Sequence, residues 1–169
     1  MRANVKFAKV RLEAKIPSKR DEDMGFDIYA CFDEDYIQFL PHETKLVPTG
    51  IASCCEPEYG FVLRERGSTG SKGIALRAGV IDSGYRNEWF VGLTNTTDKV
   101  LYISKLNAEE LYLSFVGDFK NMIVYPYEKA IAQALLVPVP KVNVEEISYE
   151  ELQNIKSERG FGALGSSGK

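Results

Sequence analysis

The strongest constraint on the fold of this chain is the regular alternation of short apolar segments with turn residues. Between Val5 and Ile103, segments rich in Val, Ile, Phe, Tyr and Leu are interrupted by Gly, Pro, Asn or Asp about every eight to twelve residues. This spacing is typical of an all-β barrel or sandwich. The predicted strands cover residues 5–11, 26–30, 36–40, 44–51, 60–65, 74–77, 88–95, 100–104, 122–125 and 131–138.

Helical patterns are confined to two short stretches. Residues 68–72 are predicted to form a single turn, and residues 107–115 a helix capped by Asn107, with early acidic residues and an apolar stripe. From residue 139 onward the chain is rich first in proline and charge and then in glycine, which is typical of a mobile terminal arm. We therefore expect a β-domain over residues 1–138 and a C-terminal arm over residues 139–169.

Composition and charge exclude several classes of protein. The 169 residues are 44% hydrophobic and 27% charged, which is typical of one globular domain that needs no disulfide or metal to fold. A formal net charge of −3 argues against a nucleic-acid groove, which needs a clustered excess of Lys and Arg. The N-terminus lacks the apolar core of a signal peptide, and no apolar run is long enough to cross a bilayer. We expect no nucleic-acid or membrane partner, and any phosphate-bearing substrate to be small.

The cysteines and the histidine limit the chemistry. Cys31, Cys54 and Cys55 form no C-x-x-C pair, so we predict reduced thiols and a cytoplasmic protein. His42, the single histidine, lies in a Pro-His-Glu-Thr turn segment and is predicted to be a solvated loop residue. Any catalytic mechanism must therefore work without histidine.

Two segments have the composition of anion-binding loops. The tail segment 159–168 combines Arg159 with several glycines and serines, whose backbone N–H groups and hydroxyls can surround a triphosphate. The segment 64–73 follows a predicted strand with Arg66, Gly67, Ser68 and further small residues at the start of a helical turn. Taken alone, the tail segment could be a disordered end without function and the segment 64–73 a basic, solvated turn, and neither is a P-loop.

Between these segments lies a turn with one carboxylate and one tyrosine. Asp82 and Tyr85 follow the apolar residues 79–81. A carboxylate near a triphosphate would be repelled unless it had a role, such as orienting a water molecule or accepting a hydrogen bond from a sugar hydroxyl. The alternative is a purely structural Asx turn that caps a hairpin.

Taken in order, five segments resemble the five motifs of the trimeric dUTPase family, and the resemblance covers nearly the whole chain. The segments are GFDIYA (25–30), RGSTGSKG (66–73), GVIDSGYRNEWFVGLTN (79–95), AIAQALLVP (130–138) and RGFGALGSSG (159–168).

The resemblance implies a fold and an activity. The expected fold is a distorted jelly-roll β-barrel that forms a homotrimer, in which the arm of one subunit closes over the substrate of another. The expected reaction is hydrolysis of dUTP to dUMP and pyrophosphate, which keeps uracil out of DNA and supplies dUMP for dTMP synthesis. Mg²⁺ is expected as cofactor, held by the three phosphates and water without a direct protein ligand.

The resemblance also implies residue roles. Asp82 is expected to hold the attacking water and to contact the 3′-hydroxyl, while Tyr85 packs under the deoxyribose and excludes a 2′-hydroxyl. Backbone groups at Gly79 and Phe90 are expected to recognise uracil. The other expected site residues support the catalytic centre (Asp27), contact phosphates (Arg66, Gly67, Ser68, Gln133 and Arg159) or belong to the arm (Leu164, Gly165, Ser166 and Ser167).

Three positions depart from the family pattern. The second-motif serine, Ser68, follows the glycine instead of preceding it. The fourth motif has Ala130 where an arginine is usual, which leaves open whether Lys129 replaces it. Leu164 stands where a phenylalanine usually covers the uracil, and either Leu164 or Phe161 is expected to form this cover.

Residues 105–120 have no counterpart in compact family members, although some bacteriophage enzymes carry an insertion here. This stretch is either a structural elaboration at the barrel edge or a docking surface for another protein. Two alternatives to dUTPase activity remain. A dCTP deaminase would need a glutamate ten residues after Asp82, where this chain has Gly92. The second alternative is a catalytically weak nucleotide-sensing or protein-binding module of the same fold.

Overall fold

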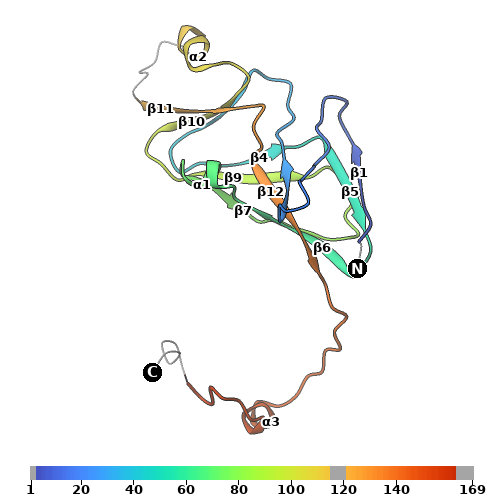
Figure 1. The fold of residues 1–169 in the computed structure, drawn as a ribbon. Coiled ribbons are helices and arrows are strands. Elements are labelled where there is room, and N and C mark those ends of the chain that lie inside the picture. The colour runs from blue at the N-terminus through green and yellow to red at the C-terminus, as the bar shows by residue number, and fades with distance from the viewer. Residues whose placement is uncertain (1–2, 115–120, 163–169) are drawn as a thin grey trace. The chain divides into compact units, whose positions relative to one another are not determined.

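The computed structural model describes residues 3–114 and 121–162. The chain divides into two compact units, Met1–Val139 and Pro140–Lys169, and each is described by itself. The first unit is built almost entirely of short strands (Figure 1). The predicted all-β class is therefore confirmed.

The described strands of the first unit form four small sheets, with orders β1-β5, β11-β10-β3, β2-β12-β6-β8 and β4-β9-β7. All pairings are antiparallel except that of β10 with β11. Among the described residues of this unit, two helices, α1 (Gly67–Gly70) and α2 (Ala108–Ser114), interrupt the strands. The strands are β1 (Val5–Lys9), β2 (Gly25–Ile28), β3 (Tyr36–Phe39), β4 (Thr44–Pro48), β5 (Ile51–Cys55), β6 (Tyr59–Arg64), β7 (Ile74–Arg77), β8 (Val80–Ile81), β9 (Phe90–Asn95), β10 (Val100–Ser104), β11 (Met122–Pro126) and β12 (Ala132–Pro138).

An aromatic cluster centred on Trp89 lies in the core of the first unit. The Trp89 ring is fully buried and packs edge-on against Phe61 and Phe7, with ring centroids 5.1 and 5.8 Å apart. Edge-to-face packing brings the positive edge of one ring to the negative face of the next. Because these residues come from β6, β1 and the segment before β9, the cluster ties three sheets together.

The predicted strand 44–51 is wrong in one respect, because it is two strands. Gly50 has a φ of 67°, which lies in the left-handed region and ends the β4 ladder. A Cβ atom at Gly50 would lie 2.8 Å from Ala14 Cβ and 2.9 Å from Cys31 Sγ. The chain therefore turns at this glycine and starts β5, which pairs with β1 instead of β9.

The segment 105–121 is the connection between two parallel neighbours, β10 and β11. A parallel pair needs a crossover of about a dozen residues or more, because the chain must return along the strand before it can pair again. α2 occupies part of this crossover, and Asn107 caps it as predicted: its Oδ1 accepts from the N–H groups of Glu109 and Glu110 at 2.9 and 3.0 Å. Leu111 is the buried residue of the helix.

The second unit contains α3 (Tyr149–Asn154), which the sequence analysis did not predict. Ser148 Oγ accepts from the Glu151 N–H at 3.1 Å, and Glu151 Oε2 accepts from the Ser148 N–H at 2.8 Å. This reciprocal capping box satisfies two donors at the helix start. The Ser-x-x-Glu spacing was the sequence signal that could have revealed the helix.

The remaining expectations about single residues concern cysteine and histidine. All three cysteines are free thiols, and burial raises the pKa of Cys31 and of Cys55. His42 is exposed in a turn, where its Nε2 lies 3.1 Å from Asp98 Oδ1. In the described part of the chain, no helix is long and apolar enough to cross a membrane.

Candidate active site

A pocket of about 320 Å³ lies where β7 separates from β9. The β7–β9 register pairs Arg77 with Gly92, and its continuation would place Gly79 opposite Phe90. The ladder ends before that point because Ala78 has a φ of 54°, an unfavourable left-handed conformation for a residue with a Cβ atom. Gly79 and Phe90 therefore line a gap between the two strands.

The other side of this pocket is the turn after β8. The Tyr85 N–H donates to the Asp82 carbonyl at 3.1 Å, and the Tyr85 hydroxyl donates to the Glu88 carbonyl at 3.1 Å. The Arg86 guanidinium reaches the Ser53 carbonyl of β5 at 3.4 Å. These contacts fix a turn in which both Asp82 and Tyr85 line the pocket and stay exposed to solvent.

Gly92 forms the inner end of the pocket, and no side chain fits there. A Cβ atom on this buried residue would lie 2.6 Å from the Arg77 carbonyl oxygen, a contact that real Cβ atoms do not make. The close approach of β9 to β7 thus requires glycine. The space left beside it belongs to the pocket.

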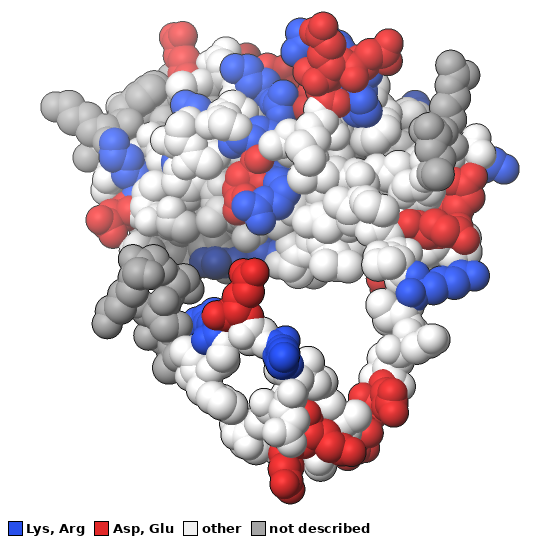
Figure 2. Space-filling view, turned by 60° about the horizontal axis from the view of Figure 1, so that its bottom comes forward, with Lys and Arg blue, Asp and Glu red and all other residues white. Residues whose placement is uncertain are grey.

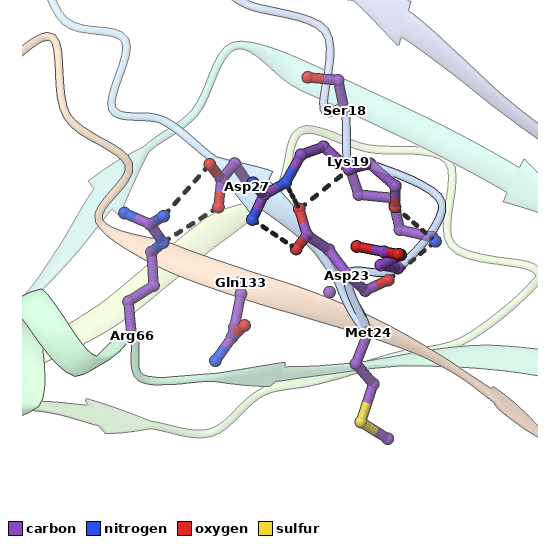
Figure 3. Close-up of a pocket in the computed structure, with 10 residues that line it drawn as sticks. Ser18, Lys19, Asp23, Met24, Asp27, Arg66 and Gln133 are labelled. Atoms are coloured by element: carbon purple, nitrogen blue, oxygen red, sulfur yellow. Dashed lines mark hydrogen bonds and ion pairs between the residues drawn. The ribbon is translucent and has the colours of Figure 1, made fainter.

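A second pocket, of about 620 Å³, contains three other predicted site residues: Asp27, Arg66 and Gln133 (Figure 3). Strand pairing explains their proximity, because Asp27 of β2 pairs with Gln133 of β12, and Gln133 pairs with Arg64 at the end of β6. Arg66 follows two residues later. Residues far apart in sequence thus meet at one sheet edge.

Arg66 and Asp27 form a two-contact ion pair. Arg66 Nε lies 3.0 Å from Asp27 Oδ1, and Arg66 Nη2 donates to Asp27 Oδ2 at 3.3 Å. Both side chains are about one-third exposed. A guanidinium has five N–H donors, so this pair leaves Arg66 with donors for an anion in the pocket. Asp27 therefore orients the Arg66 guanidinium and leaves its other N–H groups able to bind an anion.

The loop before β2 forms the far wall of this second pocket. Arg20 and Asp23 pair through two contacts of 2.9 Å, and this hydrogen-bonded pairing with Arg20 lowers the pKa of the Asp23 carboxyl. The Lys19 ammonium donates to the Arg20 and Asp23 carbonyls at 3.2 and 2.8 Å. The charges of this loop are therefore largely satisfied within the loop itself.

Ser68 lies on α1 and contacts a buried tyrosine. The Tyr125 hydroxyl donates to the Ala130 carbonyl at 2.7 Å and lies 3.2 Å from Ser68 Oγ. A phenol has one hydrogen to donate, so Ser68 is the donor in the second contact. The Ser68 hydroxyl is therefore linked, through the Tyr125 hydroxyl, to the Ala130 carbonyl of the fourth motif.

Asp82 and Arg66 lie toward opposite ends of β6, although the first pocket extends along this strand as far as Leu63. The β6–β8 register pairs Phe61 with Ile81, so Asp82 comes next to the start of β6, whereas Arg66 comes just after its end. Six residues of strand span about 20 Å at roughly 3.3 Å per residue. One chain therefore keeps Asp82 well apart from the cluster of Asp27, Arg66 and Gln133.

The chain is similar to known proteins of one family. The family model described as dUTPase matches residues 13–107. The deoxyuridine 5′-triphosphate nucleotidohydrolase of Nautilia profundicola is 36% identical, over 98% of this chain and 99% of the relative. The chain belongs to the dUTPase family. The enzyme of the same name from Neisseria meningitidis serogroup A is 32% identical, over 94% of this chain and 97% of the relative.

Solved dUTPase structures share the fold. The dUTPase of Staphylococcus bacteriophage 80alpha with dUPNHPP superposes with a TM-score of 0.73 at 20% identity, over 98% of this chain and 99% of the other. A dUTPase from phage phi11 of S. aureus gives 0.64 at 18% identity, over 85% and 96%. The predicted jelly-roll fold of the dUTPase family is thereby confirmed, with its strands here in four sheets.

The predicted dUTPase site residues fall into separate places within this chain. Gly79, Asp82, Tyr85 and Phe90 share the first pocket, and Asp27, Arg66 and Gln133 share the second, with Gly67 and Ser68 on the adjoining α1. Arg159 lies in the second unit, where its Nε donates to the Gly162 carbonyl at 3.1 Å. Leu164, Gly165, Ser166 and Ser167 lie outside the described residues.

The departures in the fourth motif also have a structural setting. Ala130 is buried, and its carbonyl accepts from Tyr125. Lys129 is exposed and is not among the described residues that line the second pocket. Phe161, one of the two candidates for covering the base, is 79% exposed in the second unit.

Sequence reasoning missed the residues that support the site. Arg86, Glu88 and Tyr125 contact Ser53, Gly50 and Ser68, which are distant in sequence, and no local motif reveals such contacts. In residues 3–114 and 121–162, no group of three or more His, Cys, Asp or Glu side chains could hold a metal ion.

Proposed function

We propose that this dUTPase-family chain hydrolyses dUTP to dUMP and pyrophosphate. The observation that carries the proposal is the pocket between β7 and β9, into which one turn brings a carboxylate, Asp82, and an aromatic ring, Tyr85. At about 320 Å³ the pocket is small enough to suit a nucleoside instead of a polymer. Relatives of more than 30% identity over at least 94% of the chain are named for this reaction.

Asp82 is the proposed catalytic base. It has no acidic neighbour in the described lining of its pocket, and its exposed carboxylate can hold a water molecule. The water oxygen bonds to the α-phosphorus, the bond from that phosphorus to the bridging oxygen breaks, and pyrophosphate leaves with the electron pair. The water proton passes to Asp82 and then to solvent. No histidine is required.

The same pocket would select the nucleoside. Gly79 and Phe90 lie where the β7–β9 ladder has opened, so main-chain groups of both strands can pair with the edge of uracil as a strand would. The Tyr85 ring lies beside this gap and would pack against deoxyribose, leaving no room for a 2′-hydroxyl. Backbone recognition in a tight pocket excludes bases with extra or different edge groups.

The second pocket would hold the phosphates. Arg66 offers the guanidinium donors that Asp27 leaves available, and Gln133 lies beside them, although its Nε2 already donates to the Glu65 carbonyl at 2.8 Å. Gly67 and Ser68 would contribute from α1, and Arg159 with the arm residues 164–167 from the second unit. Charge neutralisation and positioning are the main sources of catalysis in phosphoryl chemistry.

Mg²⁺ is the proposed cofactor, carried by the triphosphate. The described acids do not form a metal-binding cluster, so substrate phosphates and water would supply the ligands, and Asp27 would support the site beside them. Bound in this way, the ion would neutralise the charge that develops on the leaving pyrophosphate. A dUTPase structure from phage phi11 is described as coordinating a structural Mg(II) ion.

The active enzyme is proposed to be a homotrimer. Because β6 separates Asp82 from Arg66 within one chain, a complete site would take the first pocket from one subunit and the second pocket from another. The arm would come from a further contact between subunits. Two roles are open for residues 105–120: a structural elaboration at the barrel edge, or a docking surface for a protein partner.

The surface charge and the thiols fit a small substrate in a reducing compartment. On the face shown in Figure 2, Lys and Arg side chains lie among Asp and Glu side chains, so a few placed cations, not a broad basic surface, would bind phosphate. Free cysteines are typical of the cytoplasm, where we propose the enzyme acts. There it would keep uracil out of DNA and supply dUMP for dTMP synthesis.

Deamination of dCTP has no support in the geometry. That reaction would need a glutamate at position 92, where even a Cβ atom would lie 2.6 Å from the Arg77 carbonyl oxygen. Glu88, the other acid of this region, is committed to the Gly50 N–H at 2.7 Å. A non-catalytic binding module is likewise not favoured by family relatives named as nucleotidohydrolases.

The test is pyrophosphate release from dUTP, dCTP, dTTP and UTP with Mg²⁺, for the parent chain and for Asp82→Asn. Release from dUTP alone is expected, and the substitution should lower kcat by roughly a hundredfold or more, because it removes the base but keeps the shape. If the parent chain released no pyrophosphate from any of the four nucleotides, the proposed function would be wrong. Full activity of Asp82→Asn would overturn only the role of Asp82.

A further inference from the structure

Glu88 is a largely buried carboxylate that the proposed reaction does not use. Its side chain is 15% exposed, and its Oε1 accepts from the Gly50 N–H at 2.7 Å. Arg11 Nε lies 3.9 Å from the same oxygen. Burying a carboxylate is costly unless it is hydrogen-bonded, so this arrangement fixes the position of Glu88.

Gly50 is a rigid partner for this carboxylate. Its φ of 67° commits the residue to one turn conformation, and its carbonyl accepts from the Val10 N–H at 2.7 Å. A Cβ atom at Gly50 would meet Ala14 and Cys31, which shows how closely the core surrounds it. The Gly50 N–H is therefore a donor whose position is set by the core.

The main chain of Glu88 in turn holds the ring of Tyr85. The Tyr85 hydroxyl donates to the Glu88 carbonyl at 3.1 Å. On the other side, the Trp89 N–H donates to the Ile51 carbonyl at 2.8 Å, and the Thr49 hydroxyl donates to the Trp89 carbonyl at 2.7 Å. The tip of the Tyr85 ring is thus connected, through Glu88, to the turn between β4 and β5.

We propose that Glu88 is a positioning residue for sugar selection: by binding Gly50 it holds the carbonyl that anchors Tyr85. The inference rests on the proposed function, because it assigns the sugar-facing role to Tyr85. A ring anchored at its hydroxyl keeps one distance from the sugar, whereas a ring that can shift makes room for a 2′-hydroxyl. Glu88 thereby acts on the choice between deoxyribose and ribose without touching the substrate.

The experiment measures kcat/KM for dUTP and for UTP in the parent enzyme and in Glu88→Ala. The ratio of the two is expected to fall by roughly tenfold, because discrimination by an added hydroxyl depends on how firmly the pocket wall is held. Glu88→Gln keeps an oxygen acceptor for the Gly50 N–H and should keep most of the ratio. A loss of stability alone would lower both values together and leave the ratio unchanged.

Glu43→Ala is the matched control. The Glu43 carboxylate also accepts from a backbone N–H, that of Leu40 at 2.8 Å, and lies 3.2 Å from a cation, Lys45 Nζ. Glu43 is not among the described residues that line either pocket. Its substitution should therefore leave the dUTP-to-UTP ratio at the parent value.

Tyr85→Phe provides a second variant that does not depend on the folding of Glu88→Ala. It removes only the anchoring hydroxyl of a partly exposed side chain, so it should lower the ratio by a similar factor. The double variant should show little further loss, since both changes break one connection. An unchanged ratio in Tyr85→Phe or in folded Glu88→Ala would overturn the inference. Such a result would leave dUTP hydrolysis by the parent enzyme intact, whereas an inactive parent would overturn both proposals.

Discussion

Two single residues, Ala78 and Gly92, shape the pocket between β7 and β9. Ala78 adopts a left-handed φ of 54° and thereby ends the β7 ladder, while Gly92 lets β9 approach β7 closely. One residue opens the gap and the other keeps its inner end narrow. Both effects come from the presence or absence of a single Cβ atom.

Gly92→Ala is expected to destabilise the fold. The new Cβ atom would lie 2.6 Å from the Arg77 carbonyl oxygen, and because that oxygen belongs to the backbone, the strands would have to separate. A cost of about 1–3 kcal/mol is expected from such overpacking, measured as a lower urea midpoint at unchanged m-value. Gly84→Ala is the control, since a Cβ atom at Gly84 meets nothing within 4 Å and should change stability by less than about 0.5 kcal/mol. Equal stability of the two variants would contradict the steric argument.

At the scale of elements, the connections between strands matter as much as the strands. Glu65 follows β6, and its Oε1 accepts from the Leu76 N–H of β7 at 3.0 Å. Its carbonyl also accepts from Gln133 of β12. One residue thus links two different sheets at the edge of the proposed phosphate pocket.

This link should depend on pH. Hydrogen bonds from the backbone N–H groups of Glu65 itself and of Leu76 hold the pKa of the Glu65 carboxyl below its usual value. A lowered folded-state pKa gives stability that is present above the unfolded value, about 4.3, and is lost as the pH falls through the folded value. Glu65→Gln should therefore show a flatter loss of unfolding free energy below about pH 4.3, measured by urea titration at several pH values. An identical acid limb in the parent and the variant would remove Glu65 from this account.

The crossover between β10 and β11 is required by the parallel pairing of these two strands. Residues 105–120 looked like an addition to a compact fold, but two adjacent parallel strands require a returning connection. At its start, the Lys105 ammonium donates hydrogen bonds to the Phe32 and Asp33 carbonyls at 2.7 and 2.9 Å. A structural role is therefore built into this segment, whatever else it contacts.

At the scale of the whole molecule, Asp82 and Arg66 lie in different pockets and toward opposite ends of β6. Each side chain is part of the proposed site, and roughly six strand residues separate them. Association of chains is the direct way to bring such distant surfaces together, and a closed ring of identical contacts does so for every subunit at once.

Mixing inactive variants tests this assembly. Asp82→Asn and Arg66→Ala, co-expressed with different tags and purified through both, should regain part of the dUTPase activity that each lacks alone. Mixed assemblies would contain some sites with an intact Asp82 from one chain and an intact Arg66 from another. Asp82→Asn mixed with Tyr85→Ala is the control and should regain nothing, because both residues lie in the same pocket of one chain. No recovery in confirmed mixed assemblies of the first pair would place the whole site within one subunit.

The sequence by itself determined the β class, most strand positions, the α2 cap and the family, because these depend on local periodicity, local hydrogen bonds and ordered motifs. It did not reveal the break at Gly50 or the short helix α3 in the tail. Only the tertiary structure decided that the motif residues divide between two pockets, since strand register joins residues far apart in sequence. It alone also decided that Glu88 and Tyr125 support the site, because their side chains contact Gly50 and Ser68, which are distant in sequence.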